Sequence, residues 1–114
     1  MKITDKAKNF LLPCNSERIK LIGIVDGQYK MLVKHNCHRD KHYEYYIKIK
    51  DVKADINGHI GFIKKYMDID YNNNTSAFSW MQKGDYIEFY VKLNIVEDNL
   101  YIERPTRINK ITNY

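Results

Sequence analysis

The sequence predicts a mainly β domain, a small barrel of five to six antiparallel strands. Stretches in which apolar and polar residues alternate recur along the chain, and turn dipeptides such as Asn57-Gly58 and Gly84-Asp85 separate them. Alternation with a period of two is typical of a strand that buries one face. The length of 114 residues and a hydrophobic fraction of 44% fit one soluble globular domain. We expect an N-terminal arm at residues 1–16 and one barrel domain at residues 17–114.

The first elements follow from local signals. Residues 1–16 are expected to form an arm or a first helical turn that ends at Pro13. The following stretch, ERIKLIGIVDGQYKMLVKH, has two apolar runs around Asp26-Gly27. Asp-Gly between strand-like runs is a strong hairpin signal, because a type I′ turn needs positive φ at both central residues. The sequence therefore predicts a hairpin at Asp26-Gly27.

The stretch HYEYYIKIKDVK predicts the next strand, with alternation that separates two faces. The expected core face carries Tyr43, Tyr45, Ile47 and Ile49. The expected outward face carries Glu44, Tyr46, Lys48 and Lys50.

Residues 54–82 are less regular. Asn57-Gly58 predicts a turn, and the apolar residues that follow fit either a strand or a helix through about Met67. The remainder of this stretch predicts a short helix or irregular insert between strands three and four.

The stretch GDYIEFYVKLN has the most regular alternation in the chain. It predicts a strand that buries Ile87, Phe89, Val91 and Leu93 and turns Tyr86, Glu88, Tyr90 and Lys92 outward. A turn at residues 97–99, a strand LYIER that ends at Pro105, and a short closing strand RINKI are expected to follow.

A five-stranded Greek-key barrel with an irregular insert before strand four is the arrangement of the OB-fold. The segment GDYIEFYVKLNIVEDNLYIERPTRINKI resembles the closing half of small OB-fold-like nucleic-acid-binding proteins of Gram-positive phages and mobile elements. In such proteins a polar-aromatic motif often precedes this strand, and here residues 58–62, GHIGF, hold that place. The resemblance covers residues 43–111. It implies an OB-like fold and nucleic-acid binding, in replication or maintenance of a phage or mobile element.

Positive charge is concentrated in the middle of the chain. The formal net charge is +5. Residues 28–66 hold nine basic and four acidic side chains, whereas the rest of the chain is balanced. Such asymmetry is typical of a protein with an anionic partner, although a solvated basic face that aids solubility gives the same pattern.

The stretch HNCHRDKH holds His35, Cys37, His38 and His42. Structural zinc sites are usually built from two close ligand pairs, and this spacing does not provide them. We expect no metal and no cofactor. The chain also lacks a phosphate-binding glycine loop, an HExxH motif and a G-x-S-x-G serine, so we expect no enzyme activity.

The two cysteines, Cys14 and Cys37, are expected to be reduced thiols, because cytosolic disulfides are rare. The longest apolar runs are far shorter than the roughly 20 residues that span a bilayer, and the N-terminus is not typical of a signal peptide. We therefore expect a cytoplasmic protein without a membrane partner. The sequence leaves the oligomeric state open.

Tyrosines beside lysines suggest a function. Single-stranded nucleic acid is bound by aromatic rings that stack on bases and by cations that hold phosphates. We therefore expect non-enzymatic binding of single-stranded nucleic acid, with single-stranded DNA favoured and little sequence preference. The candidate binding residues are Lys34, Tyr46, Lys48, Lys50, Lys53, Lys64, Lys65, Tyr90, Lys92, Arg104 and Arg107.

Two alternatives stay open. Outward tyrosines also pair across strands or cover the stems of lysines without binding anything. The same basic face also fits an acidic surface of another protein. In that alternative the chain binds and modulates a protein of the host or of the mobile element.

Overall fold

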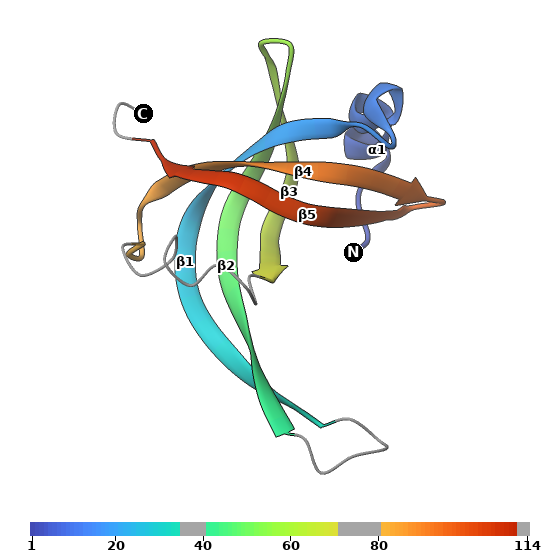
Figure 1. Cartoon of the computed structure of the whole chain (residues 1–114). Helices are drawn as coiled ribbons and strands as arrows, with labels where there is room; N and C mark the ends of the chain where they lie inside the picture. The colour runs from blue at the N-terminus through green and yellow to red at the C-terminus, as the bar shows by residue number, and fades with distance from the viewer. Residues whose placement is uncertain (35–40, 71–80, 112–114) are drawn as a thin grey trace.

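The computed structural model describes residues 1–34, 41–70 and 81–111. Its elements are α1 (Asp5–Leu11), the 3₁₀ turn η1 (Leu12–Cys14), β1 (Arg18–Lys34), β2 (Lys41–Ile56), β3 (His59–Asp70), β4 (Tyr86–Val96) and β5 (Asn99–Lys110). The five strands form one antiparallel sheet in the order β3-β2-β1-β4-β5. In Figure 1 the sheet curls, so that β4 and β5 run across the direction of β1, β2 and β3.

This order confirms the predicted mainly β, OB-like class. The chain makes β1, β2 and β3 in sequence and then returns to place β4 on the free side of β1. That return gives the Greek-key order β4-β1-β2-β3. The expected insert falls between β3 and β4, where residues 71–80 lie outside the described part of the chain.

The predicted hairpin at Asp26-Gly27 is wrong. β1 runs through both residues, and it pairs with β2 on both sides of them. The register shifts between Val25 and Gly27, which makes Asp26 the extra residue of a β-bulge. The bulge lies where the pairing of β1 changes: residues 18–24 pair with β4, whereas from Gly27 onward β1 pairs with β2 alone. Continuous pairing with β2 outweighs the local turn preference of Asp-Gly.

The predicted strand end at Pro105 is also wrong, because β5 continues through it to Lys110. β5 is an edge strand, and its register with β4 shifts between the pairs Lys92–Glu103 and Tyr90–Thr106. Proline is tolerated at such a position, since an edge or a bulge needs no ladder hydrogen bond from it. The separate closing strand RINKI is therefore the second half of β5.

Residues 59–70, for which the sequence fitted either a strand or a helix, form strand β3, which pairs with β2 along its length. The turns at Asn57-Gly58 and Gly84-Asp85 are confirmed. Asn57, Gly58 and Gly84 have φ values of 54°, 87° and 97°, which glycine and asparagine adopt most easily.

The core lies on the inner, concave side of the sheet. The predicted core residues Ile47, Ile49, Ile87, Phe89, Val91 and Leu93 are all buried there at 0% exposure. Tyr43 and Tyr45, predicted on the same face, have side chains outside the described part.

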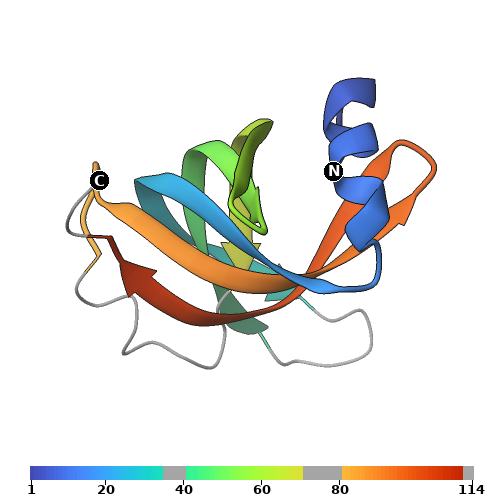
Figure 2. The same cartoon turned by 90° about the horizontal axis from the view of Figure 1, so that it is seen from above.

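The N-terminal arm completes this core. Figure 2 shows α1 on the concave side of the sheet, next to the β4–β5 hairpin. Ala7 and Leu11 are buried in the core cluster, and Phe10 lies so close to Gly61 of β3 that a Cβ there would come within 2.8 Å of its ring. Lys2 bridges to Asn99 of β5. The arm therefore contacts both edge strands of the half-barrel.

No helix in the described part of the chain is long and apolar enough to cross a membrane.

Candidate nucleic-acid interface

The outer face of β2 carries the predicted tyrosine and lysines. Ile47 and Ile49 point into the core at 0% exposure, and the residues that alternate with them, Tyr46, Lys48 and Lys50, lie on the opposite face, half-buried. The predicted alternation of this strand is therefore confirmed between Tyr46 and Lys50.

Tyr46 has an aromatic neighbour that sequence reasoning missed. Tyr29 of β1 lies opposite it in the ladder, and the two rings stack with centroids 5.2 Å apart and planes inclined by 17°. Tyr29 is 38% exposed. Tyr46 therefore does pair across strands, which is the alternative in which outward tyrosines bind nothing. The pair still presents aromatic surface to solvent.

β3 adds a third tyrosine to this face. Tyr66 lies opposite Lys50 in the ladder and is 43% exposed. The ammonium groups of Lys48 and Lys65 lie 4.8 and 5.6 Å from the centre of its ring. Both distances are typical of cation–π contacts, which hold the two lysines beside an aromatic surface.

Asp68 of β3 introduces a negative charge into the same area. It lies opposite Lys48 in the ladder. Burial raises the pKa of the Tyr29 phenol, and the charge of Asp68 and a hydrogen bond to it raise the pKa further. Tyr29 therefore stays a neutral hydrogen-bond donor to Asp68 well above neutral pH.

Further along β2 and β3 the face becomes apolar. Lys53 lies opposite Ile22 of β1 on one side and Phe62 of β3 on the other. Phe62 is 55% exposed. These residues border a hollow of about 270 Å³, which is lined by Ile22, Gly23, Ile24, Asp51, Lys53, Phe62 and Tyr86.

The lysines of this face lack carboxylate partners. Within the described ranges of the chain, Lys48, Lys50 and Lys53 make no ion pair. Lys8 and Lys110 are different, because they pair with Asp98 and Asp85 at 3.1 and 3.4 Å. An ammonium group without a carboxylate partner is the kind that can neutralise a phosphate.

We call this surface the outer platform. It consists of Tyr29, Tyr46, Lys48, Lys50, Lys53, Phe62, Lys65 and Tyr66.

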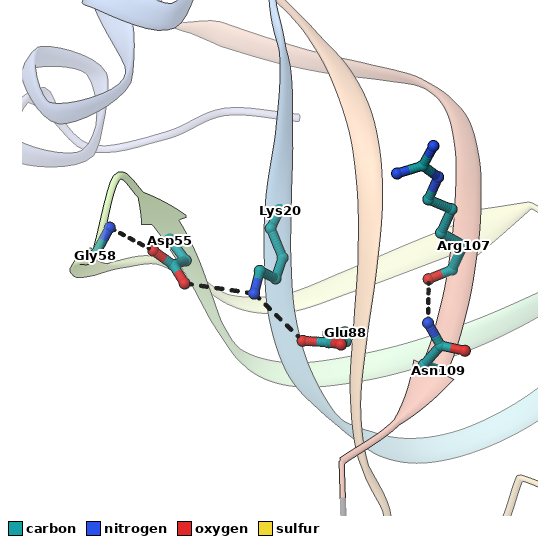
Figure 3. Close-up of polar contacts among 6 residues, drawn as sticks. All are labelled: Lys20, Asp55, Gly58, Glu88, Arg107 and Asn109. Carbon is teal, nitrogen blue, oxygen red and sulfur yellow. Dashed lines mark hydrogen bonds and ion pairs between the residues drawn. The ribbon is translucent and has the colours of Figure 1, made fainter.

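Tyr90 and Lys92 of β4 belong to the same sheet but lie apart from the outer platform. An ion cluster on β1, β2 and β4 (Figure 3) includes Lys20, which lies opposite Tyr90 of β4 on one side and opposite Asp55 of β2 on the other. In it, Lys20 lies 3.7 Å from Asp55 and 3.5 Å from Glu88. The charge of Glu88 is the main cause of a raised pKa of Lys20. The Lys20 ammonium is therefore engaged by carboxylates.

The β4–β5 area has its own aromatic and basic pair. The guanidinium carbon of Arg107 lies 5.7 Å from the centre of the Tyr90 ring, and Lys92 is exposed nearby on β4. Arg107 has a φ of 53°, and its carbonyl oxygen accepts a hydrogen bond from the Asn109 side-chain amide at 3.2 Å (Figure 3). The predicted set is thus split into two groups on one sheet.

Three predicted residues join neither group. The Lys64 ammonium donates to the carbonyl of Lys2 and so holds the N-terminal arm against β3. The side chains of Lys34 and Arg104 lie outside the described part of the chain.

The predicted absence of a metal in HNCHRDKH stays a prediction. Residues 35–40 and the side chain of His42 lie outside the described residues. Among those that the structure describes, no group of three histidine, cysteine or acidic side chains could hold a metal ion.

Cys14 is a free, buried thiol of the core, whereas Cys37 lies outside the described residues. Burial raises the pKa of the Cys14 thiol, and the neighbouring Glu17 carboxylate raises it further.

Sequence reasoning missed Tyr29, Phe62 and Tyr66. Phe62 and Tyr66 share one face with Ile60 if residues 59–70 form a strand. The sequence fits either a strand or a helix there, so this face could not be assigned. The predicted hairpin pairs Tyr29 with the first half of β1, whereas the structure pairs it with Tyr46 of β2.

No protein-family model, curated protein or solved structure matches this chain.

Proposed function

We propose that this protein binds single-stranded nucleic acid, with DNA favoured, through the outer platform. The observation that carries the proposal is the position of exposed aromatic rings directly beside lysines without carboxylate partners on β1, β2 and β3. This combination matches what a flexible, unpaired strand requires.

Each part of the platform has a distinct role. Lys48, Lys50 and Lys53 follow one strand, so they can contact successive phosphates of an extended backbone. Tyr66, the Tyr29–Tyr46 pair and Phe62 offer ring surface on which bases stack. Stacking contributes about 1–3 kcal/mol per base and depends little on base identity.

The proposed activity is binding without catalysis of a reaction. The resemblance of residues 43–111 to OB-fold-like proteins of phages and mobile elements motivates a role in the replication or maintenance of such an element. The area around Tyr90, Lys92 and Arg107 offers a second contact for a longer strand.

The proposal is tested by fluorescence anisotropy with labelled single-stranded DNA, duplex DNA and single-stranded RNA of one length, each at two salt concentrations. Binding is expected to be tightest for single-stranded DNA and to weaken as salt rises. Equal affinity for duplex and single strand would argue against stacking, since duplex bases do not expose their ring faces.

One observation favours a protein partner as the second candidate. Ile60 and Phe62 of β3 are both 55% exposed. Exposed apolar side chains next to charges are common at protein interfaces. If no oligonucleotide showed salt-dependent binding, binding of an acidic protein partner would become the favoured function.

A further inference from the structure

The hollow on the outer face is shaped by a second β-bulge. The pairs Ile22–Lys53 and Ile24–Lys50 leave Gly23 of β1 opposite two residues of β2, Asp51 and Val52. Val52 is buried in the core, and Asp51 is the extra residue, with a φ of 52°. Bulges often redirect a side chain at functional sites. This bulge places the exposed carboxylate of Asp51 between the outward lysines Lys50 and Lys53.

The walls of the hollow suit a flat aromatic ligand. Ile22 and Ile24 lie on β1, between Phe62 of β3 and Tyr86 of β4, and all four line the hollow. Ile22 is buried yet stands outside the core cluster, so its burial comes from the outer face. Unpaired bases stack on exposed aromatic rings, and Phe62 presents such a ring.

Two charged groups at the hollow are complementary to a nucleotide. Lys53 lines it and has no carboxylate partner among the described residues, so its ammonium can contact a phosphate. Asp51 also lines it, and within the described part of the chain its carboxylate makes no hydrogen bond or ion pair. A carboxylate facing a polyanion opposes binding unless it contacts hydrogen-bond donors of a base.

Guanine presents those donors better than the other bases. Its Watson–Crick edge carries two adjacent donors, N1–H and the N2 amino group, which match the two oxygens of a carboxylate. Adenine and cytosine place an acceptor nitrogen next to their amino group, and thymine has one N–H between two carbonyls. Bidentate hydrogen bonding to Asp51 therefore distinguishes guanine from the rest.

We infer that the hollow binds one unpaired guanine of the single strand, stacked on Phe62 and recognised by Asp51. The inference rests on the proposed function and adds to it a preference for one base at one position.

The test compares three labelled strands of about twelve nucleotides, a length within the range that one OB-fold covers. One is all thymidine, one carries a central guanine, and one carries a central hypoxanthine, which lacks only the N2 amino group. Affinities are measured for the unaltered protein and for Asp51→Asn, because asparagine tolerates the same backbone conformation. Glu97→Gln is the matched control, since Glu97 has a φ of 56° at the β4–β5 turn, away from the hollow.

The unaltered protein is expected to bind the guanine strand at least about fivefold more tightly than the thymidine strand, the lower end for a bidentate contact. The affinity for the hypoxanthine strand is expected to lie between the affinities for the guanine and thymidine strands. Asp51→Asn is expected to abolish the preference while binding the thymidine strand as well or better, because it removes a negative charge. Glu97→Gln is expected to keep the preference.

Equal affinity of the unaltered protein for the guanine and thymidine strands would overturn the inference and leave the proposed function standing. A preference that survives in Asp51→Asn would also overturn it. Failure to bind any of the three strands would instead remove the proposed function itself, and the inference with it.

Discussion

Tyr29 and Tyr46 stack across β1 and β2 with ring centroids 5.2 Å apart, and this pair lies on the face of the sheet opposite the core. One ring face of each tyrosine is thus occupied by the other. A base can stack only on the surface that remains, and Tyr29 is 38% exposed. The pair therefore presents a stacked, partly exposed aromatic surface on the outer face of the sheet.

Tyr46→Ala is expected to lower the affinity for single-stranded DNA by about 1–3 kcal/mol, because it removes one ring and the partner that orders Tyr29. The slope of log affinity against log salt should stay nearly unchanged, since no charge is lost. Anisotropy titrations at several salt concentrations measure both quantities.

Tyr101→Ala is the matched control, because Tyr101 is 49% exposed on β5, away from the platform. If it weakened binding as much as Tyr46→Ala, the aromatic contribution could not be assigned to the β1–β2 pair.

Leu11→Ala is expected to lower the free energy of unfolding by about 2–5 kcal/mol, the usual range for truncating a buried leucine. Leu11 of α1 is fully buried in the core cluster. The adjacent Leu12 is 43% exposed, so Leu12→Ala should change stability little. Urea unfolding of the two variants measures the difference. Equal midpoints would mean that α1 is not part of the cooperative core.

Lys20→Met is expected to cost about 0.2–1 kcal/mol at neutral pH, because it leaves Asp55 and Glu88 without their shared cation. The folded state raises the pKa of Lys20, chiefly through Glu88. A raised folded-state pKa gives stability that is complete below the unfolded value, about 10.4, and is lost as pH rises through the folded value.

The difference in unfolding free energy between Lys20→Met and the unaltered protein should therefore be constant from neutral pH to about pH 10 and shrink above it. Tyr29, whose pKa is also raised, is present in both proteins and cancels in this comparison. A difference that grew with alkaline pH would contradict the assignment of the stabilising charge to the Lys20 ammonium.

Local pattern was enough to predict the strands in which burial and alternation agree. Phe89 and Val91 of β4 are buried at 0% exposure, as expected, because every second residue of that strand is apolar. The same reasoning placed Tyr46, Lys48 and Lys50 on the outer face.

Where local signals and long-range pairing disagree, pairing decides. Asp26-Gly27 has the residue types of a hairpin turn, but β2 pairs with β1 on both sides of it and converts it into a bulge. Pro105 is accommodated because β5 is an edge strand with a shifted register. Neither the position of a strand in the sheet nor its register can be deduced from residue types within the strand.

The candidate site was predictable only in part for the same reason. The contacts of Tyr29 with Tyr46 and of Lys48 with Tyr66 depend on the registers of β1–β2 and β2–β3. The β1–β2 register shifts at Asp26 and at Asp51, and the β2–β3 register shifts between Val52 and Lys53, and the residue types within one strand do not reveal these shifts.

The most direct test of the outer platform is the salt dependence of single-stranded DNA binding by a protein that carries both Lys48→Glu and Lys50→Glu. These lysines alternate outward with the buried Ile47 and Ile49, so the fold should be retained. Circular dichroism and urea unfolding check this point. The control carries Lys2→Glu and Lys6→Glu, which make the same charge change at exposed positions of the N-terminal arm.

The Lys48→Glu/Lys50→Glu protein is expected to bind single-stranded DNA much more weakly than the unaltered protein. Its slope of log affinity against log salt is expected to be flatter by about 1.4, at about 0.7 per lost phosphate contact on a single strand. The control should keep the slope of the unaltered protein. A folded Lys48→Glu/Lys50→Glu protein with unchanged affinity and slope would contradict the proposal that the outer platform binds the nucleic acid.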